Sequence, residues 1–163
     1  MRNVIKILNA YARNKISDEL RVCGGNGSYY YYKEKTIVIE RKTFENPEDT
    51  MCHSDKLFMD FLRDNFDLTL EDKYYPLVTF LHEVGHYMTY DVITVEENDL
   101  CESIKEEIEE ETGELTDDTQ EWQDSYIRYM CLIDEYLASE WACDWIEYHP
   151  EEVKSLIEKI WGE

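Results

Sequence analysis

The residues of this chain whose types and spacing most clearly suggest chemistry are His82, Glu83 and His86, which form an HExxH motif. On a helix, side chains at positions i and i+4 project from one face, so the two imidazoles can bind one metal ion from the same side. Glu83 lies about 100° around the helix from His82, so it can reach a water molecule beside the metal without being a ligand. This arrangement is typical of a zinc site with Glu83 as general base.

The surroundings of the motif favour a metal site over a chance occurrence. The chain has four histidines, and two of them make this pair. The flanking segments 79–81 and 87–88 are uncharged, and so are Val84 and Gly85 between the histidines. An apolar shell limits the access of solvent to a metal and lowers the local dielectric constant, which suits a catalytic zinc ion.

A catalytic zinc usually has three protein ligands, so a third ligand must come from elsewhere in the chain. Glu135 shares a helix face with three small residues, Ala138, Ser139 and Ala142. Small side chains allow this helix to pack closely on the helix of the motif, which would bring Glu135 within reach of the metal. We therefore favour Glu135 as the third ligand.

Glu140 is the alternative third ligand. It lies among Ile133, Leu137 and Trp141 on an apolar face, and buried acids are rare unless they are paired or bind a metal. Asp144 follows Glu140 at i+4, so an acid of this pair could instead orient a ligand histidine by accepting a hydrogen bond from it, without binding the metal.

Apolar periodicity predicts the elements that must position these groups. Helices are predicted over residues 2–16, 55–65, 71–90, 97–111, 120–148 and 151–161. Pro76 places the start of the third of these helices at Tyr74 or Tyr75. Strand-like runs at Tyr29–Tyr32 and Thr36–Glu40 predict a β-hairpin, while residues 23–28 and 46–49 are expected to form turns or loops. The sequence thus predicts a compact α+β domain over residues 1–163, with a small hairpin packed on helices and the HExxH helix at its centre.

The charge of the chain is strongly negative and unevenly distributed. Its 163 residues include 38 acidic and 16 basic side chains, with a formal charge of −22. This balance argues against direct binding to nucleic acid or to an anionic membrane. Residues 91–125 contain fifteen acidic side chains and one basic one, Lys105, and their apolar stripe is thin (Leu100, Ile104 and Ile108). We expect an acidic helix and loop inserted into the domain.

The chain shows no sign of a membrane or export segment. No apolar run approaches the roughly 20 residues that span a bilayer, and the first residues do not resemble a secretory signal. The five cysteines are odd in number, widely spaced and without a Cys-x-x-Cys pair, which indicates reduced thiols. We expect a cytoplasmic protein.

The two motif helices together resemble those of known zinc peptidases. His82–His86, followed by a helix that reads Glu135-x-x-Ala138-Ser139-x-Trp141-Ala142, is similar to the zincin metallopeptidases with a glutamate as third ligand. The ImmA/IrrE family is the nearest, with a second motif that reads Glu-x-x-Ala-Asn-x-Phe-Ala, and ArdC-type metallopeptidase domains have a similar helix. The resemblance implies a compact zincin domain, often encoded by phages or mobile elements, that cleaves regulatory proteins.

By this resemblance the chain would hydrolyse a peptide bond with a Zn²⁺ ion, Glu83 taking a proton from the attacking water. A tyrosine near the second motif, Tyr126, Tyr129 or Tyr136, could stabilise the oxyanion. The strand Thr36–Glu40 could align a peptide substrate as an added β-strand. The alternative function is a non-catalytic inhibitor or interaction protein that keeps the scaffold and uses its acidic surface to mimic DNA.

Overall fold

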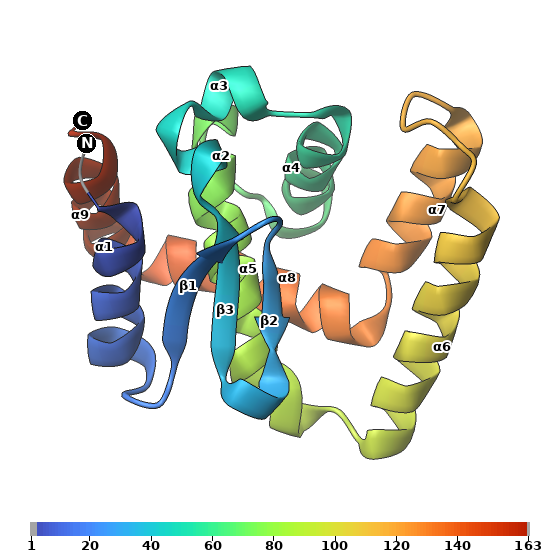
Figure 1. The fold of residues 1–163 in the computed structure, drawn as a ribbon, viewed down its shortest axis with the longest axis horizontal. Helices are drawn as coiled ribbons and strands as arrows, with labels where there is room; N and C mark the ends of the chain where they lie inside the picture. Colours follow the sequence, from blue (N-terminus) through green and yellow to red (C-terminus); the bar gives the residue numbers. More distant parts are fainter. Residues whose placement is uncertain (1–2, 163) are drawn as a thin grey trace.

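A three-stranded sheet lies in front of a buried helix in the computed structural model, which describes residues 3–162 (Figure 1). The strands are β1 (Arg21–Gly25), β2 (Tyr29–Tyr31) and β3 (Thr36–Glu40), in the spatial order β1-β3-β2. β2 pairs antiparallel with β3, so the predicted hairpin is confirmed. With the surrounding helices, this small sheet makes an α+β domain, as the sequence predicted.

Strand β1 was missed by the sequence analysis, and it changes the place of β3 in the sheet. The glycines at its end suggested a turn, but the segment pairs parallel with β3 from Arg21↔Thr36 to Gly25↔Glu40. Val22 is buried, and its backbone N–H donates to Asn9 Oδ1 at 2.9 Å. Because β3 has a partner on both sides, the expectation that it offers a free edge to a substrate is wrong; β1 and β2 are the edge strands.

Short and medium helices enclose the sheet (Figure 1). They are α1 (Val4–Tyr11), extended by a π-helical turn (Ala12–Ile16), α2 (Arg41–Glu45), α3 (Pro47–Thr50), α4 (His53–Phe66) and α9 (Pro150–Trp161). The helices expected over 2–16, 55–65 and 151–161 correspond to α1 with its π-helical turn, α4 and α9, although residue 2 lies outside the described residues; α2 was not predicted. The expected loop over 46–49 is wrong in part, because Pro47 begins the short helix α3, a position that proline favours.

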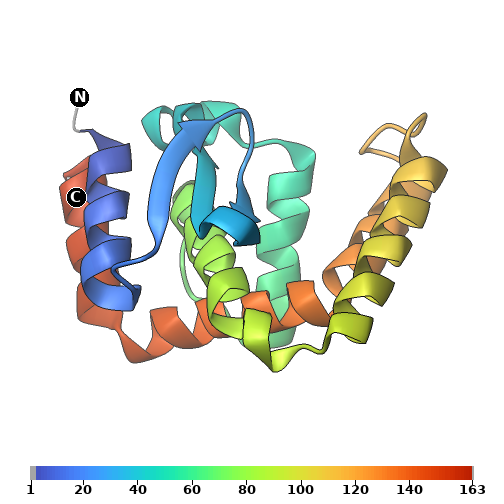
Figure 2. The ribbon, with the colours of Figure 1, turned by 60° about the horizontal axis from the view of Figure 1, so that its bottom comes forward.

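Helix α5 (Tyr75–Thr89) carries the HExxH motif through the centre of the domain. It begins at Tyr75, as Pro76 predicted, and nearly all of its residues from Tyr75 to Gly85 are buried. The sheet covers one side of it, and helix α8 (Ile133–Tyr148) crosses it on another (Figure 2). The motif is therefore buried from His82 to Gly85, and His86 at its end is partly buried.

The single helix predicted over residues 120–148 is wrong. The chain forms helix α7 (Gln120–Met130), breaks at Cys131 and Leu132, and starts α8 at Ile133. Leu132 is extended, with φ −62° and ψ 144°. The segment holds no glycine or proline to mark this break, so tertiary packing overrides local helix propensity here.

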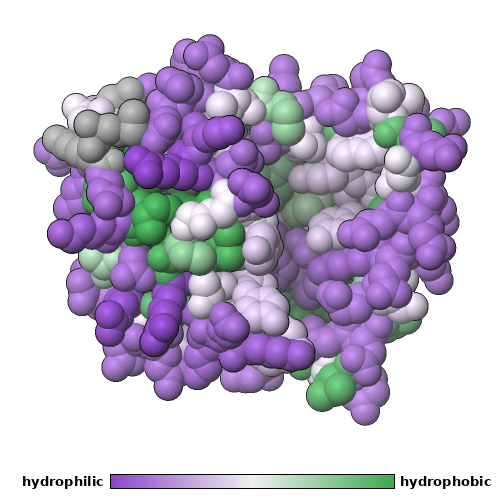
Figure 3. All heavy atoms as spheres, viewed as in Figure 1, coloured by the Kyte–Doolittle hydropathy of each residue, from purple (hydrophilic) through white to green (hydrophobic). Residues whose placement is uncertain are grey.

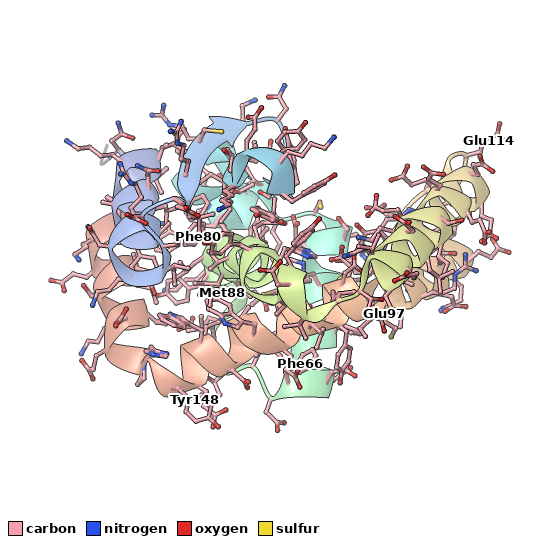
Figure 4. The ribbon with its side chains drawn as sticks, turned by 90° about the horizontal axis from the view of Figure 1, so that it is seen from below. Phe66, Phe80, Met88, Glu97, Glu114 and Tyr148 are labelled. Atoms are coloured by element: carbon pink, nitrogen blue, oxygen red, sulfur yellow. The ribbon has the colours of Figure 1, made fainter. Side chains whose placement is uncertain are left out.

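Helices α6 (Val95–Thr112) and α7 form a hairpin that projects from the rest of the domain (Figures 1 and 2). Figure 4 shows Glu97 near the start of α6 and Glu114 just beyond its end, with many side chains turned outward between them. The buried residues of α6 are Cys101 and Ile108, whereas Leu100 is 60% exposed, so the apolar stripe differs from the expected one. The acidic segment is thus a helical hairpin, which extends to Met130, beyond the expected boundary at residue 125.

Within residues 3–162, none of the helices is both long and apolar enough to cross a lipid bilayer.

Candidate metal centre

The structure brings His82, His86 and Glu135 together in one buried group that could hold a metal ion. Glu135 Oε2 lies 3.0 Å from His82 Nε2 and 3.3 Å from His86 Nε2, and the two imidazole nitrogens are 3.1 Å apart. Around a tetrahedral ion with bonds of about 2.0–2.1 Å, ligand atoms stand about 3.3 Å from one another. The three atoms are therefore spaced as ligands of a single ion.

Close packing of α8 on α5 places Glu135 at the histidines. Gly85 lies between the two histidines, and a Cβ atom built on it would meet the Ala138 carbonyl oxygen at 2.3 Å. Ala138, Ser139 and Ala142 are fully buried at this crossing. The small residues of α8 thus have the role that the sequence suggested, and Gly85 is their counterpart on α5.

The structure does not bring Glu140 or Asp144 to the histidines. Both are exposed, as is Ile133, which was expected to share an apolar face with Glu140. Five residues along a helix rotate the side chain by about 140° beyond a full turn, which directs Glu140 away from α5. Of the two acids considered, only Glu135 can be a ligand in this fold.

A hydrogen bond to Ser139 orients the ring of His82. Ser139 Oγ lies 3.2 Å from His82 Nδ1, and both residues are buried. When His82 donates its Nδ1–H to this hydroxyl, the lone pair of Nε2 points toward Glu135 and His86 and is free to bind a metal ion. The ring of Phe58 packs edge-on against His82, with centroids 5.3 Å apart, and limits its rotation further.

Glu83 lies beside the histidines but is not in the ligand group. Its side chain is buried, and it lines the same cavity as Tyr30 of β2. Burial raises the pKa of Glu83 to about 7; the negative charge of Glu135 adds to this rise, whereas His82 opposes it. A carboxyl group with a pKa near neutrality can both accept and release a proton at physiological pH.

A cavity of about 250 Å³ opens onto these groups. Glu83, His86 and Glu135 line its inner side. Strand β2 and the tyrosine that follows it border the cavity on one side, and α6 and α7 border it on the other. Figure 3 shows the corresponding hollow between the body of the domain and the hydrophilic surface of the hairpin. A ligand that enters from solvent can therefore reach the histidines.

Two residues that the sequence analysis missed, Lys105 and Asp134, also line the cavity. Lys105 Nζ lies 2.7 Å from Glu135 Oε1 and 2.5 Å from Asp134 Oδ2. The only sequence signal for this role was that Lys105 is the one basic residue within residues 91–125.

The three tyrosines considered as oxyanion donors differ in position. Tyr129 lines the cavity, and its ring centroid lies 5.2 Å from Lys105 Nζ. Tyr136 packs against Phe66, and Tyr126 stacks on Trp122. Of these three tyrosines, Tyr129 is the one that can contact a ligand in the cavity.

Comparisons of the chain with known protein families, with curated proteins and with solved structures found no match.

Proposed function

We propose that this protein is a zinc-dependent metallopeptidase that cleaves a protein or peptide substrate. The observation that carries the proposal is the convergence of His82, His86 and Glu135, with Glu83 beside them on the same cavity. Two imidazoles and one carboxylate favour zinc over magnesium or calcium, which prefer oxygen ligands alone. This ligand set also leaves a coordination position for water, as catalytic zinc sites require.

Glu83 and Tyr129 at the cavity then each have a role in hydrolysis. Bound zinc would polarise the scissile carbonyl and lower the pKa of a water molecule. Glu83 is proposed to take the proton from that water and deliver it to the leaving amine, and its raised pKa suits both transfers. Tyr129 would donate a hydrogen bond from its phenol to the oxyanion; burial raises the pKa of this phenol further above neutrality.

Strand β2 is the proposed guide for the substrate backbone. It is an edge of the sheet, and Ser28, Tyr29 and Tyr30 line the cavity next to Glu83. An extended peptide can add to such an edge through main-chain hydrogen bonds. This role replaces the one that the sequence analysis gave to Thr36–Glu40.

The zincin resemblance is part of this proposal. The HExxH motif and the Glu135 helix support a peptidase nearest the ImmA/IrrE family, which would act on regulatory proteins. A cytoplasmic location is proposed with it, in keeping with five free cysteines.

Cleavage of an unfolded test protein is the experiment that checks the proposal. Zinc-loaded wild type and Glu83→Gln would be incubated with reduced, carboxymethylated casein, and the products identified by mass spectrometry. We expect cleavage by the wild type, inhibition by a chelator, and a loss of about 10²–10⁴-fold in Glu83→Gln with zinc retained. Equal cleavage by both proteins would contradict the role of Glu83.

The same experiment separates the peptidase from the alternative of an acidic binding protein. A zinc-loaded wild type that cleaves neither casein nor a mixed peptide library would contradict the peptidase. The alternative then predicts salt-sensitive binding to a DNA-processing enzyme, which persists in Glu83→Gln and is lost when the acidic residues of 106–111 are neutralised.

A further inference from the structure

Lys105 is the link between the acidic hairpin and the candidate metal centre. It lies on α6, and its side chain is only 14% exposed. Its ammonium group contacts Glu135 at 2.7 Å and Asp134 at 2.5 Å, and it lies 5.2 Å from the centroid of the Tyr129 ring. An ammonium group has three protons to donate, and carboxylates of α8 accept two of them here.

The two oxygens of Glu135 have different partners. Oε2 faces His82 and His86, whereas Oε1 accepts the hydrogen bond from Lys105. A carboxylate ligand can bind a metal through one oxygen or through both. A cation fixed on Oε1 competes with the metal for that oxygen, and so favours binding through Oε2 alone.

Asp134 fixes the position of Lys105 relative to Glu135. Its Oδ1 accepts the backbone N–H of Glu135 at 2.9 Å, and its Oδ2 accepts from Lys105. Asp134 is itself buried, so the lysine is held by two carboxylates at the first turn of α8. This explains why one lysine lies within an otherwise acidic helix.

We propose that Lys105 is a positioning residue of the metal centre, which holds Oε1 of Glu135 so that this glutamate binds the metal through Oε2 only. The hairpin α6–α7 then contributes to the metal centre, because Lys105 on α6 keeps Oε1 of Glu135 from occupying a second coordination position of the metal. This inference rests on the metal site of the proposed function. Its test does not depend on peptidase activity.

A purely structural ion pair between α6 and α8 would have a different consequence. Loss of such a pair changes stability, but it leaves the number of atoms bound to the metal unchanged. Coordination number therefore separates the two roles, and cobalt(II) reports it, because the visible absorption bands of the ion weaken as coordination rises from four to five.

The experiment compares four proteins titrated with cobalt(II) chloride after removal of bound metal: wild type, Lys105→Met, Lys105→Arg and Arg128→Met. Arg128→Met is the matched control, since it removes the same charge from the hairpin by breaking the exposed Arg128–Glu111 pair at 3.0 Å. Lys105→Gln replaces Lys105→Met if circular dichroism shows that the latter does not fold.

We expect the wild type, Lys105→Arg and Arg128→Met to give the same intense spectrum. Lys105→Met should lose intensity, and X-ray absorption of its zinc form should show one additional oxygen bound to the metal. An unchanged spectrum in Lys105→Met would overturn the role of Lys105 while leaving the metal site intact. A wild type that binds no cobalt would overturn both this inference and the proposed function.

Discussion

Gly85 of α5 and Ala138 of α8 lie so close that a Cβ atom on Gly85 would be 2.3 Å from the Ala138 carbonyl oxygen. This contact sets the crossing of the two helices. Glu135 lies three residues before Ala138 and Ser139 directly follows it, and both reach His82 from this crossing. The geometry of the candidate metal centre therefore depends on a position that takes no part in binding the metal.

Replacement of Gly85 by alanine should destabilise the protein and weaken metal binding together. The added methyl group meets backbone atoms, which cannot move aside as a side chain can, so we expect a loss of about 1–3 kcal/mol in the free energy of unfolding. Gly113→Ala is the control, because Gly113 has helical φ and ψ and its nearest neighbour is at 3.3 Å. Urea denaturation of both variants would measure the difference, and equal stabilities would contradict the close crossing.

Ser139→Ala should weaken zinc binding without unfolding the protein. The substitution removes the partner of His82 Nδ1, and loss of such a supporting hydrogen bond typically costs 10–100-fold in metal affinity. Competition with a chromogenic chelator measures the affinity. Ser103→Ala, at an exposed position of α6, should bind zinc as the wild type does. Wild-type affinity in Ser139→Ala would show that the hydroxyl does not orient the ring.

Tyr129→Phe should reduce the rate of peptide hydrolysis while zinc stays bound. Removal of one oxyanion donor costs about 10²–10³-fold in kcat. Tyr136→Phe is the control, because that ring packs against Phe66 and does not line the cavity. Steady-state kinetics on a fluorogenic peptide would distinguish the two variants, and similar rates for both would remove Tyr129 from the mechanism.

The sequence predicted the three residues that the structure brings together as possible ligands, His82, His86 and Glu135. The spacing of His82 and His86 places both on one helix face, which is a property of local geometry. The small residues after Glu135 predicted a close helix crossing, and the structure has one at Gly85. Lys105 could not be placed, because its contact with Glu135 joins residues 30 positions apart. No local pattern encodes such a contact.

The errors in the predicted secondary structure have related causes. Glycines usually mark turns, so residues 23–28 were interpreted as a turn, yet pairing with β3 makes residues 23–25 the end of strand β1. The break between α7 and α8 at Cys131 and Leu132 has no glycine or proline, so no local signal marks it in the sequence. It matters for the site, since it places Asp134 and Glu135 in the first turn of α8.

The central claim is that His82, His86 and Glu135 bind one metal ion, and the zinc content of purified protein tests it most directly. Wild type, His82→Ala, Glu135→Ala and Glu140→Ala would be measured by plasma mass spectrometry after equilibration with zinc and gel filtration. The account predicts about one zinc per chain in the wild type and in Glu140→Ala, and almost none in the other two. Zinc retained in Glu135→Ala, or lost in Glu140→Ala, would contradict the assigned ligand set, and a wild type without zinc would contradict the metal centre itself.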